Sequence, residues 1–559
     1  MRAMLNRLLL FLALLIAPGA VSAQGVVSAA DPRAAAAGQE ILRAGGSATD
    51  AAMAMMLALT VVEPQSSGIG GGGFLLHHDA RSGTIQTIDG REMAPSSARP
   101  DRFLGPDGKP RPFPEAYPGG LSVGVPGNMR LMAQAHQRWG RLPWTRLFEP
   151  AIRLAEEGFT ISRTTAGMLR QWAPMWQESF PEARKIYWKD GKPLAQGERV
   201  RNPALAETLR TLAKDGPDAF YRGRIARQIS EAVDEAKVNK AELSAADMAA
   251  YSAKNRPAVC TQYRKYRVCG MGPPSSGATT VLQILELVER FPLKSWGARD
   301  PRSWHVIAEA MKLAYADRDK YLGDRDFVPV PVAGLIDPAY LRPRSNLISL
   351  TRPIGRYEPG TPPGAAARTA ARSGEIMGTT HFVAVDAEGN VANMTSTIEH
   401  IFGSQLIAGG FFLNNELTDF SLAPDRDGAP VANRVEPGKR PRSSMSPTIV
   451  YDETGKPVLA LGSAGGPRII MHVTKTLIGW MDFGLPAQEA IALPNIFLGG
   501  DATLVERGTF LAEMAPRLSR INGTVMASDL GSKINAAERT AQGWRGAADP
   551  RSEGVALAQ

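Results

Sequence analysis

The sequence is poor in the residues that hold metal ions and in those that build a histidine-based catalytic triad. Among 559 residues there are only seven histidines and two cysteines. His77 and His78 are adjacent, and no histidine spacing matches the H-E-x-x-H pattern of a zinc site. We therefore expect no metal site, and a Ser-His-Asp triad is disfavoured.

A second absence is that of long apolar runs beyond the N-terminus. Arg2 and Arg7 are followed by an apolar run, residues 8–17, and then by small residues up to Ala23. This order is typical of a secretory signal peptide. An uncleaved membrane anchor is the alternative, but the run falls short of the ~20 apolar residues that a span needs. We expect residues 1–23 to be removed and the mature protein to be exported with no membrane segment.

The two cysteines lie close together in the sequence. Cys260 and Cys269 flank a polar centre, as the ends of a β-hairpin would, and an exported protein meets oxidising conditions. The spacing predicts a local disulfide, with two separate thiols as the alternative.

Charge of one sign is not concentrated anywhere. The formal net charge is +9, but the basic residues are scattered and no nucleic-acid-binding motif is present. With 44% hydrophobic and 21% charged residues, the composition is near the globular average. A solvated basic surface is therefore favoured over a nucleic-acid partner.

Sequence patterns divide the chain into a mainly helical part and a shorter part rich in strands. After residues 45–46, both glycine, a helix is expected with Thr49 or Asp50 as its cap. The glycine run of SSGIGGGGF lacks the Gly-Lys-Ser/Thr of a phosphate-binding loop, which favours a tight turn. Helical patterns continue over about residues 128–347. A connector rich in proline, glycine, alanine and arginine, residues 352–378, precedes the strands.

The strand that follows the connector begins with two threonines. THFVAVD and VANMTSTI flank the short loop AEG, which predicts a β-hairpin. With Asp386 opposite Asn390, counting outward places Thr379 opposite Thr397, or one residue away if a bulge intervenes. The two hydroxyls are therefore expected to be neighbours.

A second hairpin is predicted in RPRSSMSPTIVYDETGKPVLALGSAGGPRII. With Asp452 opposite Pro457, outward counting brings two serines opposite two glycines that lead into a helix: Ser443, Ser444, Gly466 and Gly465. Backbone N–H groups at a helix start can bind an anion. Hydroxyls beside such donors suit acyl transfer, in which a nucleophile attacks and an oxyanion must be held.

The nucleophile also needs a base, and histidine is scarce. A threonine with a free α-amine carries its own base, whose unperturbed pKa is about 7.7–8.0. The chain would have to be cut between Gly378 and Thr379, at the end of the flexible connector. The alternative is that the two threonines merely begin an edge strand, which threonine favours.

Several motifs together resemble the γ-glutamyltransferase family of N-terminal nucleophile hydrolases, and the match covers nearly all of the mature chain. In the family's order they are GGSATDAAMAMMLALTVVEPQSSGIGGGGF, DGREMAP, GPPSSG, KLAYADRD, TTHFVAVDAEGNVA, LNNELTDF, KRPRSSMSPTIV, GSAGGPRII and ADPRS. The resemblance implies an α/β fold, a four-layer αββα sandwich. It also implies one precursor that cleaves itself into a large subunit, residues 24–378, and a small subunit, residues 379–559, which form a heterodimer.

The same resemblance implies small-molecule substrates and no cofactor. The donors would be glutathione or other γ-glutamyl compounds, and the acceptors would be water, amino acids or peptides. Resemblance to bacterial members favours the periplasm, with secretion to the medium left open.

Roles follow for the residues that match the family's motifs. Thr379 is similar to the nucleophile of both cleavage and catalysis, and Thr397 to the hydroxyl that supports it. Gly465 and Gly466 would form the oxyanion hole. The other matched residues would hold the donor, its α-carboxylate by Arg91 with Ser443 and Ser444, and its α-amino group by Glu416 and Asp419.

The sequence departs from the family pattern at Glu399, where many members have asparagine. The segment SLAPDRDGAPVANRVEPG is also shorter than the counterpart that carries a lid in other members, and GGFF is trimmed. As a substrate-binding residue, Glu399 would strengthen ammonium binding or change selectivity, and a more open pocket would admit other acyl groups. The leading interpretation is an exported γ-glutamyltransferase and hydrolase. The alternatives are an amide acylase similar to cephalosporin acylases and a processed, inactive peptide-binding protein, against which the intact Thr379 argues.

Overall fold

The computed structural model describes residues 25–367, 370 and 378–559. The predicted signal peptide, residues 1–23, lies outside the described residues, as do residues 368–369 and 371–377 of the predicted connector.

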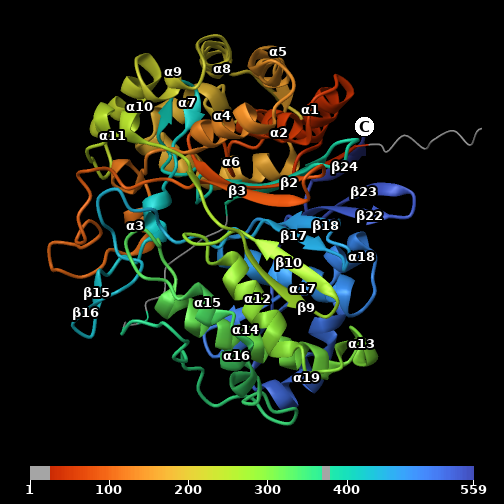
Figure 1. The fold of residues 1–559 in the computed structure, drawn as a ribbon. Helices are drawn as coiled ribbons and strands as arrows, with labels where there is room; N and C mark the ends of the chain where they lie inside the picture. The colour runs from red at the N-terminus through yellow and green to blue at the C-terminus, as the bar shows by residue number, and fades with distance from the viewer. Residues whose placement is uncertain (1–24, 368–369, 371–377) are drawn as a thin grey trace, which may run out of the picture.

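Two antiparallel sheets are stacked in the centre of the molecule (Figure 1). The larger sheet has seven strands, which are in spatial order β24 (Val555–Ala558), β1 (Val26–Ala29), β11 (Thr380–Val385), β12 (Val391–Thr397), β2 (Gly72–Asp79), β3 (Thr84–Gly90) and β8 (Lys254–Asn255). The smaller sheet has six strands, which are β23 (Gly543–Ala548), β22 (Asn535–Thr540), β18 (Pro457–Gly462), β17 (Thr448–Tyr451), β10 (Tyr266–Gly270) and β9 (Val259–Tyr263). A disulfide joins Cys260 and Cys269, which face each other across β9 and β10.

Helices cover the outer face of each sheet (Figure 1). Four of them pack on the seven-stranded sheet or on one another beside it: α1 (Pro32–Arg43), α2 (Ala48–Val62), α4 (Asn128–Trp139) and α5 (Glu149–Glu157). Three lie beyond the six-stranded sheet: α12 (Gly277–Val288), α14 (Pro301–Tyr321) and α17 (Ile469–Met481). The predicted four-layer αββα sandwich is therefore confirmed.

Helix α2 is buried along its whole length, and it begins earlier than the sequence suggests. Its cap is Ser47 rather than Thr49 or Asp50. The Ser47 hydroxyl accepts from the Asp50 N–H (3.1 Å), and the Asp50 carboxylate accepts from the Ser47 N–H (3.0 Å). This reciprocal capping box fixes the start of the helix at Ala48.

The glycine run that follows α2 brings backbone against backbone. A Cβ atom on Gly71 would lie 1.9 Å from the carbonyl oxygen of Thr397, so only glycine fits there. The glycine run therefore lets β2 pack closely against the end of β12, where the predicted hydroxyl pair lies.

Buried amides join the two sheets face to face. Asn393 on β12 donates to the carbonyl oxygens of Thr448 (2.9 Å) and Leu461 (3.1 Å) in the other sheet. Asn535 on β22 donates to the carbonyl oxygen of His381 on β11 (2.9 Å). Because a buried amide without a partner is costly, these bonds fix how the sheets lie on each other.

The predicted connector does not separate two structural domains. The chain before it supplies β1, β2, β3 and β8 to one sheet and β9 and β10 to the other, and the chain after it supplies the remaining strands of both. The part after the connector also contains α17, α18 (Ala487–Ala492) and α19 (Phe510–Asn522). Both parts therefore share one core.

Smaller elements complete the chain. The other helices are α3 (Phe113–Ala116), α6 (Arg163–Glu178), α7 (Pro181–Tyr187), α8 (Pro203–Asp215), α9 (Asp218–Tyr221), α10 (Arg224–Asp234), α11 (Ala245–Ala250), α13 (Leu293–Trp296), α15 (Val332–Leu335) and α16 (Pro338–Ser345). The other strands are β4 (Phe159–Thr160), β5 (Trp188–Lys189), β6 (Lys192–Pro193), β7 (Arg199–Val200), β13 (Ile407–Ala408), β14 (Phe411–Phe412), β15 (Asp425–Arg426), β16 (Ala429–Pro430), β19 (Ile496–Gly499), β20 (Ala502–Glu506) and β21 (Val525–Ser528).

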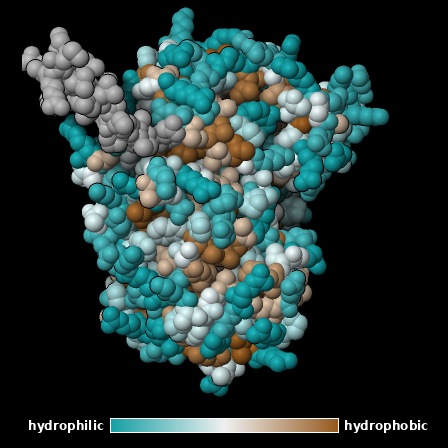
Figure 2. Space-filling view, turned by 90° about the vertical axis from the view of Figure 1, so that its right-hand side faces the viewer, coloured by the Kyte–Doolittle hydropathy of each residue, from teal (hydrophilic) through white to brown (hydrophobic). Residues whose placement is uncertain are grey.

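The face of the molecule in Figure 2 is largely hydrophilic, with hydrophobic residues in separate patches. Within the described part of the chain, no helix combines the length and the apolar character that crossing a membrane requires.

Candidate active site

Two threonine hydroxyls meet at the end of the hairpin formed by β11 and β12. Thr379 directly precedes β11, and its Oγ1 lies 3.0 Å from Oγ1 of Thr397, the last residue of β12. The ladder runs without a register shift up to Thr380 opposite Ser396, as outward counting from the loop predicts. Thr379 and Thr397 are only 4% and 2% exposed. Their contact is therefore largely shielded from solvent.

The backbone on either side of this pair has unusual conformations. Thr379 has a φ of +102°, and its N–H donates to the carbonyl oxygen of Ser66 (2.9 Å). Glu399 has a φ of +74°, and its N–H donates to Oγ1 of Thr397 (2.8 Å). The Glu399 carboxylate accepts a hydrogen bond from Asn415. Glu399 is thus fixed beside the hydroxyl pair.

Gly465 and Gly466 follow β18 and open a short 3₁₀ turn, Gly466–Arg468. Their φ values are +131° and +58°, which glycine adopts readily. Among the residues that the structure describes, neither glycine N–H donates a hydrogen bond. These two donors are therefore available to an anion, and Gly466 lines one cavity with Thr379.

The second predicted hairpin matches the sequence reasoning only in part. Thr448 lies opposite Leu461, in the predicted register, but the register shifts between Val450 and Tyr451 and the ladder ends at Thr448. Ser443 instead forms an isolated bridge with Ser275. Within the described chain, Ser443 and Ser444 are thus not strand partners of the glycines.

Arg91 lies just after β3 and is 1% exposed. Its guanidinium forms ion pairs with Glu416 and Asp419 and donates to the carbonyl oxygens of Pro441 (3.2 Å) and Arg442 (2.9 Å). The sequence-based roles put Arg91 on one group of a ligand and the two acidic residues on another. The structure joins the three side chains directly, so a ligand meets a preformed charge cluster.

This cluster holds more acidic than basic groups. Glu92 lies 3.9 Å from Arg91, and burial raises its pKa to about 7 although Arg91 opposes this. Burial also raises the pKa of Glu416 well above its ordinary value, and the charges of Glu92 and Glu399 add to the effect. Oε2 of Glu416 is buried without a hydrogen-bond partner among the described residues. The cluster is therefore suited to a cation that brings hydrogen-bond donors.

Ser443 and Ser444 lie beside the cluster, where each is already hydrogen-bonded. Oγ of Ser444 accepts from Nη2 of Arg318 (2.6 Å), and Oγ of Ser443 accepts from the N–H of Met445 (3.1 Å). Arg318 is a residue that the sequence reasoning did not assign, although it lies in the motif KLAYADRD. Asn415, in LNNELTDF, was missed in the same way.

One cavity brings these groups together, and we call it the threonine cavity. Its volume is about 20 Å³, and it is lined by Arg91, Thr379, Thr397, Glu399, Glu416, Asp419, Ser443, Ser444, Met445, Gly466 and Ile469. Gly465 and Gly378 line a neighbouring cavity instead. Nothing in the sequence marks Met445 and Ile469 as lining residues, because apolar side chains carry no chemical signature. In residues 25–367, 370 and 378–559, no group of three His, Cys, Asp or Glu side chains is arranged to hold a metal ion.

Two stacked sheets between helical layers, with a threonine hydroxyl at the start of a central strand, define the fold class of the N-terminal nucleophile hydrolases. The gamma-glutamyltranspeptidase family model matches residues 34–559, and the chain belongs to that family.

Individual relatives are similar over most of their length. The glutathione hydrolase proenzyme of Bacillus subtilis (strain 168) is 37% identical over 486 residues, which cover 85% of this chain and 81% of that protein. The glutathione hydrolase proenzyme of Escherichia coli (strain K12) is 38% identical over 484 residues, 84% of this chain and 80% of that protein. The crystal structure of cephalosporin acylase from Bacillus halodurans superposes with a TM-score of 0.85 at 28% identity and covers 96% of both chains.

Proposed function

We propose that the protein is a self-processing γ-glutamyltransferase and hydrolase. It cleaves the γ-glutamyl bond of glutathione and related donors and passes the γ-glutamyl group to water or to the amine of an amino acid or peptide. The observation that carries this proposal is the hydroxyl pair of Thr379 and Thr397 in one cavity with the Arg91 charge cluster. A γ-glutamyl donor has a reactive carbonyl at one end and an ammonium and a carboxylate at the other, which matches this arrangement.

In this mechanism Thr379 is both the nucleophile and the source of its base. Oγ1 attacks the γ-carbonyl carbon, and the α-amine of Thr379, released by a cut after Gly378, accepts the proton and returns it to the leaving amine. The unperturbed pKa of such an amine, about 7.7–8.0, is close to neutral pH, where it can do both. Thr397 orients the attacking hydroxyl from 3.0 Å.

The negative charge that develops on the γ-carbonyl oxygen is assigned to the N–H groups of Gly465 and Gly466. One such donor is worth about 2.7–4 kcal/mol in other acyl-transfer enzymes. Water or an amine then attacks the ester of Thr379, and the γ-glutamyl group leaves with the new partner.

The charge cluster is assigned to the donor's α-carbon. Glu416 and Asp419, with Glu399 beside them, take the α-ammonium, and Arg91 takes the α-carboxylate with the hydroxyls of Ser443 and Ser444. An ammonium brings three N–H donors, which suits the unpartnered oxygen of Glu416.

The same hydroxyl is proposed to cut its own chain. The products are a large subunit, residues 24–378, and a small subunit, residues 379–559, held together as a heterodimer. The B. subtilis and E. coli relatives are both named proenzymes, which supports a processed precursor. Residues 1–23 are proposed as the signal that exports the precursor to the periplasm.

N-terminal sequencing combined with amine-release assays tests this proposal. We expect two chains, one of which begins Thr-Thr-His, and release of aniline from a γ-glutamyl anilide. Thr379→Ala is expected to remain one chain without turnover, whereas Arg91→Ala is cut but binds the donor weakly. A Thr379→Ala protein that is still cut after Gly378 would assign the cut to another protease.

An amide acylase with a different acyl donor is the second candidate. The similarity to a cephalosporin acylase favours it. Faster release from a glutaryl anilide, which keeps the terminal carboxylate but lacks the α-ammonium, than from a γ-glutamyl anilide would select this candidate.

A further inference from the structure

One peptide unit at the start of the glycine turn has two sides with different tasks. The N–H of Gly465, which is proposed to hold the oxyanion, belongs to the same planar unit as the carbonyl group of Ala464. In a trans peptide these two groups point in opposite directions. Whatever holds the Ala464 carbonyl in place therefore also sets the direction of the Gly465 N–H.

The Ala464 carbonyl is held by the side chain that precedes it. Oγ of Ser463 donates to this carbonyl oxygen (3.2 Å) and lies 2.9 Å from Nδ1 of His472. Ser463, Ala464 and His472 are between 0% and 2% exposed. Solvent is therefore not at hand to replace the serine, and the three residues form a buried chain of hydrogen bonds.

One arrangement of the protons satisfies this chain best. A serine hydroxyl has a single proton, so when it goes to Ala464 the ring of His472 must donate to Oγ from Nδ1. Nε2 of the ring then carries no proton, and it has no hydrogen-bond partner among the described residues. The opposite arrangement, with the ring proton on Nε2 and the serine proton directed to Nδ1, leaves two buried groups of the described chain without partners, namely the Nε2 proton and the Ala464 carbonyl. Because each such group is costly, the chain runs from the ring through the hydroxyl to the carbonyl.

The ring of His472 also packs directly on the turn. It lies in the first turn of α17, and a Cβ atom on Gly465 would lie 3.1 Å from Cε1 of the ring. Burial lowers the pKa of His472 well below its ordinary value, and the charges of Lys475 and Arg468 act in the same direction. The ring is therefore uncharged at neutral pH, which preserves the proton arrangement.

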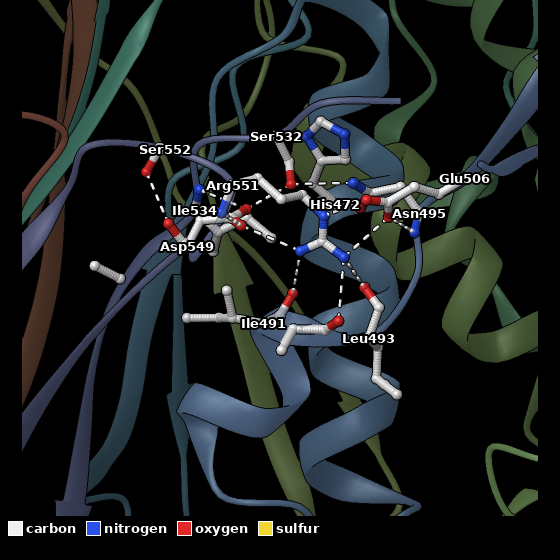
Figure 3. Close-up of polar contacts among 12 residues, drawn as sticks. His472, Ile491, Leu493, Asn495, Glu506, Ser532, Ile534, Asp549, Arg551 and Ser552 are labelled. Atoms are coloured by element: carbon white, nitrogen blue, oxygen red, sulfur yellow. Dashed lines mark hydrogen bonds and ion pairs between the residues drawn. The ribbon is translucent and has the colours of Figure 1, made fainter. Parts of the chain in front are cut away.

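A polar network anchors the helix that carries His472. Nζ of Lys475, also on α17, donates to the carbonyl oxygens of Ile491 and Leu493. Figure 3 shows Arg551, from the motif ADPRS, donating to the same two carbonyl oxygens and to two carboxylates. Helix α17, the end of α18 and the C-terminal motif are therefore joined, which limits how far the ring can move away from the turn.

We propose that Ser463 and His472 are positioning residues that aim the N–H of Gly465 at the carbonyl oxygen of the bond to be cut. This inference rests on the proposed function. In the step concerned, Oγ1 of Thr379 bonds to the acyl carbon, its proton passes to the α-amine, and an electron pair of the C=O bond moves onto the oxygen. Neither positioning side chain lines the threonine cavity or its neighbour. Both act through the peptide between Ala464 and Gly465, whose N–H is fixed in direction before the charge develops.

Substitutions at both ends of the hydrogen-bond chain test this role. Ser463→Ala removes the hydroxyl, and His472→Leu removes the ring donor but keeps an apolar side chain. We expect each to lower kcat for a γ-glutamyl anilide by about 10–10²-fold, less than the roughly 10²–10³-fold that loss of an oxyanion donor costs. His472→Asn should keep kcat within about threefold of the wild type, because its amide N–H lies near the position of Nδ1. Turnover is expressed per cleaved chain, counted by denaturing electrophoresis, so that slow processing is not mistaken for slow turnover.

A ligand of the donor site separates a misdirected N–H from general damage. Norvaline has the carbon skeleton and the α-groups of glutamate, with a methyl group in place of the γ-carboxylate. Its inhibition constant therefore reports the Arg91 cluster and not the oxyanion hole, and it should be unchanged in all three variants. The double variant Ser463→Ala/His472→Leu should be no slower than the slower single variant, because both substitutions break one chain, whereas independent losses would multiply.

Thr49 and His77 provide a matched control. Their side chains form another buried contact between a hydroxyl and an imidazole (3.2 Å), and neither residue lines the threonine cavity or its neighbour. Thr49→Val and His77→Leu should lower the melting temperature and leave kcat unchanged.

Failure of the inference and failure of the function look different. If the wild type hydrolyses neither γ-glutamyl nor glutaryl anilides, the proposed function is wrong and the inference with it. If the wild type is active but Ser463→Ala and His472→Leu keep its kcat, only the positioning role is wrong. A weaker norvaline complex in the same variants, losses that multiply in the double variant, or a His472→Asn protein as slow as His472→Leu would overturn it as well. The two substitutions lie at separate residues, so either one decides the question if the other prevents folding.

Discussion

Thr379 holds a backbone conformation that a β-branched residue rarely adopts. A φ of +102° costs of the order of 1–3 kcal/mol, and the hydrogen bonds to Ser66 and Thr397 hold the residue there. This strain lies at the bond that is proposed to be cut, so the cut would release it. The hydroxyl of Thr397 then has two partners to position, Oγ1 of Thr379 and the N–H of Glu399.

Thr397→Val keeps the shape of the side chain and removes the hydroxyl. We expect slower self-cleavage and a kcat lower by up to about tenfold, because a hydrogen bond worth about 0.5–1.5 kcal/mol no longer orients the nucleophile. The loss of precursor with time and the kcat for a γ-glutamyl anilide measure this. Thr395→Val on the same strand, where the hydroxyl contacts His381 (2.8 Å), is the control. Equal slowing in both variants would contradict the role of Thr397.

Glu92 is a residue of the Arg91 cluster whose charge changes near neutral pH. Because burial raises its pKa to about 7, it is neutral below that pH and ionised above it. The ionised form adds negative charge beside the proposed ammonium site. The inhibition constant of glutamate, a ligand with the same α-carbon groups, should therefore fall as the pH rises from about 6 to about 8. Glu92→Gln should flatten this dependence, and a flat wild-type profile would contradict it.

At the residue scale, local counting succeeds where a short loop fixes the register. The N–H of Asp386 donates to the carbonyl oxygen of Asn390 across the loop (3.1 Å), and counting outward from this pair places Thr379 opposite Thr397. The ion pairs of Arg91 with Glu416 and Asp419 join side chains more than 300 residues apart. Family resemblance places these residues in one site, but no local pattern predicts that they touch.

The turn of Gly465 and Gly466 is the element on which the proposed oxyanion hole depends. Alanine at Gly465 would have to adopt a φ of +131°, and its Cβ would lie 3.1 Å from the ring of the buried His472. We expect Gly465→Ala to shift the turn and to lower kcat about 10²–10³-fold, as loss of one oxyanion donor does. A kcat assay on the folded protein measures this.

Gly455 provides a matched control for this variant. It lies in the loop between β17 and β18 with a φ of +80°, and a Cβ there would meet nothing within 4 Å. Gly455→Ala should cost roughly 1–2 kcal/mol of stability and leave kcat unchanged. A similar fall in kcat in both variants would argue that general destabilisation is the cause.

The disulfide closes the hairpin of β9 and β10 at the edge of the six-stranded sheet. The cross-link spans nine residues, which in the chain-entropy model corresponds to about 2–3 kcal/mol. Replacing Cys260 and Cys269 together by serine should lower the urea midpoint accordingly and leave kcat unchanged, because neither residue lines the threonine cavity. An unchanged midpoint would show that the cross-link adds no stability.

At the scale of elements, the sequence predicts that a strand exists better than it predicts the residue at which the strand ends. The predicted register of β17 and β18 holds at Thr448, but Pro447 directly precedes it and has no N–H to donate. The ladder ends there, and Ser443 is free to bridge to Ser275. The start of α2 was misplaced for a related reason, since several capping residues stand in a row and only Ser47 completes a reciprocal cap.

In both sheets, strands of one proposed subunit lie beside strands of the other. Strand β1 lies between β24 and β11, and β12 lies between β11 and β2. A cut after Gly378 therefore leaves each chain hydrogen-bonded along several strands to the other. We expect the two chains to elute as one species in native buffer, at the volume of uncut Thr379→Ala, and to separate only in denaturant. Native size exclusion followed by denaturing electrophoresis tests this, and a freely eluting small chain would contradict it.

This strand order is the part of the fold that local patterns do not predict. The composition change at the connector divides the sequence in two. Strand β1 nevertheless lies near the N-terminus and pairs with β11 and β24, which both follow the connector. Local periodicity identifies strands but not their distant neighbours, because pairing partners are chosen by how the layers pack. The four layers were predicted from family resemblance alone.

The position of β11 inside the seven-stranded sheet also sets an order of events. The hydroxyl pair belongs to the hairpin of β11 and β12, but it is enclosed in the sheet only when β2 has docked on β12 and β1, from the N-terminal end of the precursor, has docked on β11. A chain that is still extended while it is being exported has no such enclosed pair. Under the proposed self-cleavage, correct assembly is therefore the activation signal, and a precursor that assembles wrongly stays inert.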